Sequence, residues 1–152
     1  MNQYAVLINL ESKTADRYTL SSLALHVTIL GIFSTKQNAQ FFTAVLAEQA
    51  ESQTSIKTVA TSRALFGINR DIPVTVVEQT EPLLQLHTNL INSVRDVAEF
   101  RAPQFIGSAF GPHVTDQGNR RVEVGSKVIL DNLTLVEILD QDVLVRSIHT
   151  LT

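Results

Sequence analysis

The sequence of 152 residues contains no cysteine. This absence excludes disulfide bonds, thiolate zinc sites and a cysteine nucleophile, and it is compatible with a reducing compartment. No apolar run approaches the roughly 20 residues that a membrane-spanning helix needs. The N-terminus also lacks the basic start of a secretion signal. We therefore expect a cytoplasmic protein that does not enter a membrane.

The chain also lacks a basic stripe. Its 12 Lys and Arg residues are outnumbered by 15 Asp and Glu residues, and the net charge is −3. Proteins that follow long nucleic acids gain much of their affinity from Lys and Arg contacts with phosphates. A long duplex is therefore not an expected partner. If the substrate is a nucleic acid, we expect a nucleotide, a short oligonucleotide or an RNA end.

No low-complexity segment, charge block or linker divides the chain, so we expect one domain over residues 1–152. One predicted helix begins at a Ser34 cap and ends near Glu51, and the other begins at Thr80, with Pro82 in its first turn, and ends near Val97. Apolar patterns predict strands over 4–10, 23–33, 55–68, 73–78, 104–115, 121–124, 128–138 and 143–151. One helix in each half favours two related lobes over a doubly wound parallel sheet.

A tripeptide occurs twice, as His26-Val27-Thr28 and His113-Val114-Thr115. Both copies lie in runs predicted to be strands, where side chains alternate between the two faces. Each histidine therefore shares a face with its threonine, while the central valine points into a lobe core. If the two strands line one cleft, the cleft holds two imidazoles and two hydroxyls.

These four groups suit phosphodiester cleavage. One imidazole can accept a proton from the attacking oxygen, and the other can donate a proton to the leaving oxygen, because histidine titrates near neutral pH. Threonine hydroxyls can donate to the phosphoryl oxygens as their charge grows. The candidate catalytic residues are His26 and His113, and the candidate phosphate-binding residues are Thr28 and Thr115.

The residues around both triplets resemble those of the two-histidine (2H) phosphoesterase superfamily, which includes 2′-5′ RNA ligase-like and cyclic phosphodiesterase proteins. Residues 25–30 (LHVTIL) match the usual first motif, and residues 110–115 (FGPHVT) match the usual Phe-x-Pro-His-Val-Thr form of the second. The helix predicted after Pro82 and the strand over 128–138 also lie where the family has comparable elements.

This resemblance implies an α+β, bilobal, pseudo-twofold (LigT-like) fold with two mostly antiparallel sheets facing a central cleft and helices outside. It also implies cleavage of 2′,3′-cyclic or related phosphodiesters without a metal or another cofactor. One departure concerns Asp116-Gln117, because many relatives have apolar residues and then an arginine after the second motif. Arg120 or Arg121 could replace that arginine.

Other residues are candidates for substrate contacts. Arginine forks suit phosphate oxygens, and aromatic rings can stack on a base. A carboxylate can accept from a base edge, although Glu137 could also mark the exit of its strand to solvent. The candidates in this group are Tyr4, Arg63, Phe110, Arg120 and Glu137. His87, on the apolar face of its helix, is predicted to be a packed and hydrogen-bonded core residue.

Several functions stay open. We expect a monomeric hydrolase of a 2′,3′-cyclic phosphate on a nucleotide or RNA end. The alternatives are a phage-type hydrolase of cyclic oligonucleotide signals, a 2′-5′ RNA ligase and a non-catalytic nucleotide-binding module. A metal site built from the two histidines and Asp116 is a weaker candidate, because threonine hydroxyls are poor ligands and no third histidine follows at ligand spacing.

Overall fold

The structure is a computed structural model, and it describes residues 1–11 and 16–152. Its two α-helices are α1 (Ala39–Ser52) and α2 (Glu81–Val94). Two short 3₁₀ helices, η1 (Pro103–Phe105) and η2 (Gly107–Ala109), precede the second triplet. The strands are β1 (Asn2–Asn9), β2 (Arg17–Thr19), β3 (His26–Thr35), β4 (Ile56–Phe66), β5 (Ile72–Val77), β6 (Glu99–Phe100), β7 (His113–Thr115), β8 (Lys127–Leu130), β9 (Asn132–Leu139) and β10 (Asp142–Thr150).

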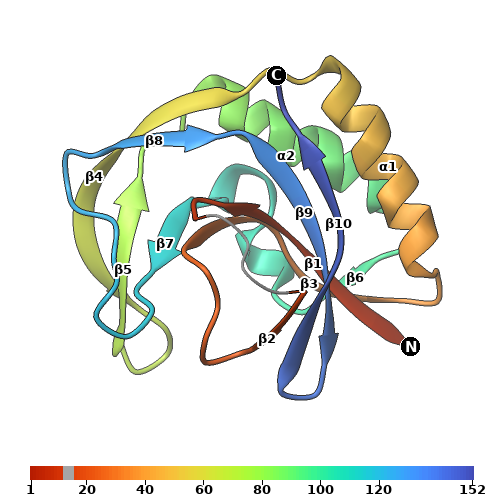
Figure 1. Cartoon of the computed structure of the whole chain (residues 1–152), viewed down its shortest axis with the longest axis horizontal. Coiled ribbons are helices and arrows are strands. Elements are labelled where there is room, and N and C mark those ends of the chain that lie inside the picture. Colours follow the sequence, from red (N-terminus) through yellow and green to blue (C-terminus); the bar gives the residue numbers. More distant parts are fainter. Residues whose placement is uncertain (12–15) are drawn as a thin grey trace.

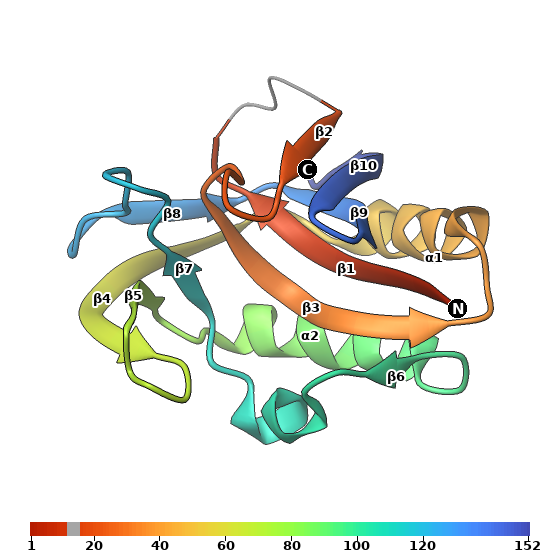
Figure 2. The ribbon, with the colours of Figure 1, turned by 90° about the horizontal axis from the view of Figure 1, so that it is seen from below.

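The strands of the described residues follow the order β2-β10-β9-β1-β3-β7-β5-β4-β8, and β6 pairs with β3. Every pairing is antiparallel. Figure 1 shows the curved sheet, and in Figure 2 the strands β4, β5, β7 and β8 lie to the left of β1 and β3. The two halves meet where β3 pairs with β7, at Val27 and Val114. The expected α+β bilobal fold is confirmed, and its two expected sheets are hydrogen-bonded to each other at this point.

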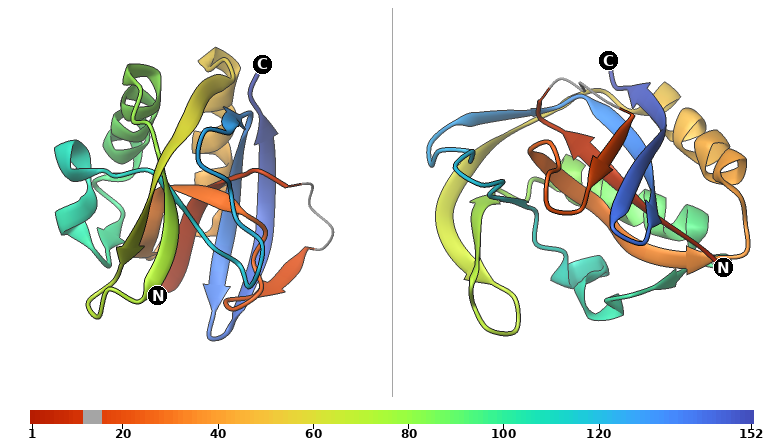
Figure 3. Two further views of the ribbon diagram at one scale, coloured as in Figure 1. Left: turned by 90° about the vertical axis from the view of Figure 1, so that its left-hand side faces the viewer. Right: turned by 60° about the horizontal axis from the view of Figure 1, so that its bottom comes forward.

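Both helices cover the same face of the sheet. Side chains from α1, including Phe42 and Leu46, share one hydrophobic core with Leu83, Leu86 and Leu90 of α2. In the right-hand view of Figure 3, α2 lies behind β1 and β3. Within residues 1–11 and 16–152, no helix is both long and apolar enough to cross a membrane.

The alternation of side chains along β1 and β3 separates this large core from a smaller one. Ile8 pairs with Val27, and both belong to the large core beneath the helices. Leu7 pairs with Thr28 and belongs to a small cluster with Val136 and Val143. The outer residues of the first triplet therefore lie on the face of the sheet opposite the helices.

The start of α2 agrees with the prediction, and the start of α1 does not. The Thr80 side chain caps α2 by accepting from the Leu83 amide, and Pro82 lies in the first turn. For α1 the cap is Asn38, whose Oδ1 accepts from the Phe41 amide, so the predicted Ser34 cap is wrong. Ser34 still belongs to β3, because it pairs with Gln3 of β1 and extends that strand.

The region between α2 and β8 holds the main errors of the predicted strands. The predicted strand over 104–115 is replaced by η1 and η2, and only its last three residues form β7. Gly107 has a φ of +74°, a left-handed conformation that ends an extended run. The predicted strand over 121–124 is absent, and the strand expected over 128–138 divides at Asp131 into β8 and β9. The short strands β2 and β6 had no predicted counterpart.

Candidate active site

The two triplets lie side by side in the structure. Val27 and Val114 form a direct antiparallel pair, and both side chains are 0% exposed. The flanking histidines and threonines are all partly exposed. Continuing this antiparallel register places His26 across from Thr115, and Thr28 across from His113, on one face. The pairing of β3 with β7 thus brings together the side chains of two triplets that are 87 positions apart in the sequence.

Both imidazole rings are anchored in the same way. Nδ1 of His26 lies 2.8 Å from the carbonyl oxygen of Ala24, and Nδ1 of His113 lies 2.8 Å from that of Gly111. A carbonyl oxygen only accepts, so Nδ1 carries the proton in both rings and Nε2 of the neutral ring holds a lone pair. Neither Nε2 has a hydrogen-bond partner among the described residues. Each triplet therefore presents one nitrogen that can take up a proton.

The electrostatic environment of His26 favours its neutral form. Burial lowers the pKa of His26 below its ordinary value, and the nearby charge of His113 lowers it further. The Ala24 carbonyl acts in the opposite direction but does not cancel the burial. The His113 ring instead packs edge-on against the Phe66 ring, with the two ring centroids 4.6 Å apart.

A pocket of about 740 Å³ opens beside Thr28 and His113. This volume is in the range of sites that hold small organic ligands. Its walls come from β3, from the β4–β5 hairpin and from the segment between β6 and β7. The side chains that line it are mostly apolar and include Ile32, Phe66, Ile68, Phe100, Phe105, Ile106 and Phe110. Arg101 and Gln104 add polar groups to the same lining.

Phe110, a candidate for stacking on a base, lines this pocket. Its ring stacks on the imidazole of His87 with centroids 4.0 Å apart and planes 6° apart. His87 is 2% exposed and is hydrogen-bonded through both ring nitrogens, so its prediction as a packed core histidine is confirmed. His149, which had no predicted role, lies in β10 with Nε2 2.9 Å from the Ser147 hydroxyl.

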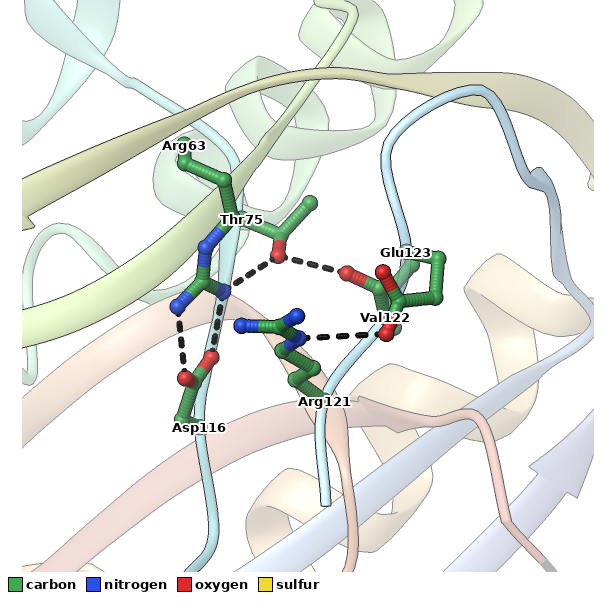
Figure 4. Close-up of polar contacts among 6 residues, drawn as sticks. All are labelled: Arg63, Thr75, Asp116, Arg121, Val122 and Glu123. Atoms are coloured by element: carbon green, nitrogen blue, oxygen red, sulfur yellow. Dashed lines mark hydrogen bonds and ion pairs between the residues drawn. The ribbon is translucent and has the colours of Figure 1, made fainter. Parts of the chain in front are cut away.

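Arg63 was a candidate phosphate ligand, and the structure gives it another partner. Its Nη1 and Nη2 donate to the two carboxylate oxygens of Asp116, each over 2.6 Å, and Nη1 also donates to the Thr75 hydroxyl (Figure 4). The Arg63 guanidinium holds the pKa of the Asp116 carboxyl below its usual range. The fork is therefore occupied in this structure, and Arg63 does not line the pocket of about 740 Å³, so its suggested contact with phosphate stays a prediction.

Asp116 itself gains a clear function in the fold. It follows Thr115, and its backbone amide donates to the carbonyl of Pro73 on β5. The Thr75 hydroxyl in turn donates to the Val122 carbonyl over 2.7 Å (Figure 4). This network fixes the end of β7 against β5 and the loop that follows. Asp116, at which the sequence departs from the usual second motif, therefore stabilises the strand that carries His113.

Arg120 is also paired. Its guanidinium donates to the carboxylate of Glu11 and, over 3.1 Å, to the carbonyl of Leu23. The hydrogen bond from Arg120 lowers the pKa of Glu11, which also accepts from the Leu25 amide. Arg120 thus ties the loop after the second triplet to the segment before the first. It is absent from the lining of the pocket of about 740 Å³, and its assignment as a substrate ligand stays a prediction.

Tyr4 and Glu137 lie away from the cleft. Tyr4 is 2% exposed and packs against Phe33 and Phe42, so it is not available to stack on a base. Glu137 is opposite Tyr4 on β9 and is 8% exposed, with its carboxylate paired to Arg146. Both suggestions for Glu137, a base-edge acceptor and a strand exit to solvent, are therefore wrong.

The sequence interpretation missed most of the pocket wall. Arg101, Gln104 and Phe105 follow β6, and Ile68 is fully exposed at the tip of the β4–β5 hairpin. The sequence carried no clear signal for them, because single apolar side chains on a protein surface are common and Phe105 was assigned to the strand predicted over 104–115. Among the described residues, no group of three or more His, Asp or Glu side chains is arranged to hold a metal ion.

Comparison with known proteins gives the fold. No protein-family model and no curated protein sequence matches the chain. Solved structures do match. TT0787 of Thermus thermophilus matches with a TM-score of 0.63 and 13% sequence identity. A protein described as a phosphoesterase matches with a TM-score of 0.60 and 15% identity. Escherichia coli LigT complexed with 3′-AMP matches with a TM-score of 0.61 and 13% identity. Each match covers 99% of this chain and 98% of the other.

These matches confirm the expected fold from end to end. The chain has the α+β fold that is shared by LigT and the other two proteins. At identities of 13–15% the similarity concerns architecture, so the function has to be argued from the site.

Proposed function

We propose that the chain is a phosphodiesterase of the two-histidine type that hydrolyses a 2′,3′-cyclic phosphate on a nucleotide or RNA end. One observation carries the proposal. Two His-x-Thr triplets lie on adjacent antiparallel strands, and both rings are held through Nδ1, while Nε2 has no partner within residues 1–11 and 16–152. If the two histidines only packed against their neighbours, there would be no reason for both rings to be held by the same hydrogen bond from Nδ1 to a backbone carbonyl. The exposed fractions of all four outer side chains also support a site at the surface of the cleft.

The proposed chemistry needs one proton acceptor and one proton donor. Nε2 of one histidine removes a proton from a water molecule as its oxygen forms a bond to phosphorus. The bond from phosphorus to one ribose oxygen breaks, and Nε2 of the other histidine, in its protonated form, donates a proton to that oxygen. The product is a ribose monophosphate ester with a free neighbouring hydroxyl. Each positioned transfer of this kind contributes on the order of 10²–10⁴-fold in rate.

The threonines and the pocket complete the proposed site. The hydroxyls of Thr28 and Thr115 donate to the two non-bridging phosphoryl oxygens, whose negative charge grows in the transition state. The apolar pocket next to Thr28 and His113 accepts the base and ribose, with Phe110 and Phe66 as flat surfaces for the base. Solved structures of LigT contain 3′-AMP, NADP⁺ or ATP, which supports a nucleotide ligand for the same fold.

A substrate panel tests the proposal. We expect the purified chain to hydrolyse one or more 2′,3′-cyclic nucleotides or RNA ends in the presence of EDTA, because the proposed acid and base are its own side chains. The panel also contains cyclic dinucleotides and trinucleotides and linear RNAs with 2′-5′ or 3′-5′ links. His26→Ala and His113→Ala serve as controls against a contaminating hydrolase.

The other outcomes separate the alternatives. Turnover confined to cyclic oligonucleotides would assign the chain to signal degradation, and joining of RNA ends would make it a ligase. Binding of 3′-AMP without turnover of any substrate would make it a nucleotide-binding module. An absolute requirement for an added divalent ion, lost with EDTA and restored by titration, would replace the two-histidine mechanism.

A further inference from the structure

His87 lies outside the two triplets, yet it touches the residues next to both of them. Its Nδ1 is 2.8 Å from the carbonyl oxygen of Ile29, the residue after Thr28. Its Nε2 is 3.0 Å from the backbone nitrogen of Gly107, and its ring stacks on Phe110, three residues before His113. A single side chain on α2 therefore contacts both halves of the site.

The hydrogen bonds fix the state of this ring. The Gly107 amide can only donate, so Nε2 of His87 must be an unprotonated acceptor. Nδ1 then carries the proton and donates it to the Ile29 carbonyl. Burial lowers the pKa of His87, which favours the same neutral form. Both ring nitrogens are hydrogen-bonded, so neither is left to exchange a proton with a substrate.

The position of this contact explains why a side chain is needed there. β3 and β7 pair at Val27 and Val114 and then separate. Further along this edge of β3, the Arg101 amide donates to the Ile32 carbonyl, and β6 pairs with β3 at Phe33. Between these points the Ile29 carbonyl on β3 is bonded by His87. His87 thus replaces a strand contact where the two halves separate and the pocket opens.

The other end of the contact reaches the second triplet through a short segment. Gly107 and Phe110 belong to the turn that leads into β7, and Gln79 holds the Phe110 carbonyl over 2.8 Å. The next carbonyl, that of Gly111, is the acceptor for Nδ1 of His113. Any shift of this segment relative to Ile29 would therefore change the position of the His113 ring.

We propose that His87 is a positioning residue, which sets the separation between the His26-Val27-Thr28 and His113-Val114-Thr115 triplets. This inference rests on the proposed function for its effect on rate, while its effect on geometry is independent of it. A neutral imidazole is suited to this role, since it offers a donor and an acceptor on opposite sides of one flat ring.

Three variants test the proposal. His87→Phe keeps a ring against Phe110 but removes the donor to Ile29 and the acceptor for Gly107. Gly107→Ala meets no atom within 4 Å but strains a backbone with a φ of +74°, so it disturbs the same contact from the other side. Leu86→Ala is the matched control, because Leu86 is a 0% exposed core residue on α2 and does not line the pocket of about 740 Å³.

The readouts separate positioning from simple destabilisation. We expect His87→Phe to lower kcat by about 10²-fold with KM changed less than threefold, since a misplacement of about 1 Å can cost that much. Leu86→Ala should lower the melting temperature at least as much, with kcat within twofold of the parent at a temperature where every variant is folded. The ring ¹H–¹⁵N NMR signals of His26 and His113 should shift in His87→Phe and Gly107→Ala and stay in place in Leu86→Ala.

The two proposals fail in different ways. If the unaltered chain turns over no substrate, the proposed function fails, and the NMR signals alone decide the role of His87. If the unaltered chain is active and His87→Phe keeps kcat within twofold, or loses no more than Leu86→Ala, the positioning role is overturned. Unchanged His113 signals in both His87→Phe and Gly107→Ala would overturn it as well.

Discussion

The two triplets have the same three residues and the same ring anchor, but their surroundings differ. His26 lies beside a small recess lined by Tyr18, Leu23 and Val143, and burial lowers its pKa. His113 lies at a pocket of about 740 Å³ and packs against Phe66. The anchoring therefore belongs to the triplet and its strand, whereas the space and the electrostatics around each ring come from the lobe that carries it.

This difference suggests unequal roles for equal sequences. A large pocket next to His113 gives room for the base and ribose of a substrate, and a restricted, apolar setting next to His26 favours a neutral imidazole. A neutral imidazole is the form that accepts a proton. Substitutions of matched residues in the two triplets test whether their roles differ.

The largest effect is expected from the histidines. His26→Ala and His113→Ala should each lower kcat by roughly 10²–10⁴-fold, because each removes one positioned proton transfer. Both side chains are partly exposed and lie on the outer face, so thermal melting should stay near that of the parent. Steady-state kinetics and melting curves measure both quantities. Near-normal kcat in either variant would contradict the two-histidine mechanism and leave the anchored rings without a role.

The threonines should come second. Thr28→Val and Thr115→Val keep the branched shape and the strand preference but remove the hydroxyl donor, which is expected to cost roughly 10²–10³-fold in kcat. Thr61→Val is a control on β4, where the hydroxyl is exposed and bonds only to the Val76 carbonyl. We expect the control to match the parent. A full loss in one triplet and none in the other would show that only one threonine contacts the phosphate.

The central valines should affect stability rather than chemistry. Val27 and Val114 are fully buried and form the pair that joins the two halves. Val27→Ala and Val114→Ala should each lower the free energy of unfolding by about 2 kcal/mol, from lost apolar burial and the cavity left behind. Urea unfolding measures this change, with Val124→Ala as the exposed control. An equally small change in all three variants would mean that the join between the halves does not depend on this pair.

The sequence predicted the parts of the site that depend on local geometry. His26 shares a face with Thr28, and His113 with Thr115, because alternation along a strand is a property of the backbone. That the two pairs meet depends on the pairing of β3 with β7. The start of α2 at Thr80 was predictable for a similar reason, since its cap and the proline in its first turn are neighbours in sequence. The catalytic and phosphate-binding roles of the four residues stay predictions.

The sequence did not reveal contacts between distant residues. Arg63 and Asp116 are 53 positions apart, and Arg120 and Glu11 are 109 apart, so neither pair could be recognised without the fold. Glu137 is neutralised by Arg146 through the pairing of β9 with β10, which alternation along β9 alone does not reveal. The pocket wall was missed because most of the strand predicted over 104–115 is absent, and 3₁₀ turns lie at its start.

The smallest effect should be seen in the titration of His26. Its pKa is lowered first by burial, which disfavours the imidazolium, and to a lesser extent by the positive charge that His113 can carry. In the unaltered chain, the NMR titration of His26 should therefore have its midpoint below about 6.5, the ordinary value for histidine. In His113→Gln the second cause is removed while burial stays, so the midpoint should move up slightly but stay below that value.

The acid limb of kcat/KM in the unaltered chain, if His26 is the base, should fall with the same midpoint, because the base must be neutral to act. A midpoint at or above the ordinary value would remove the reason for assigning the acceptor role to His26. A midpoint that does not respond to His113→Gln would mean that the two rings are electrostatically independent.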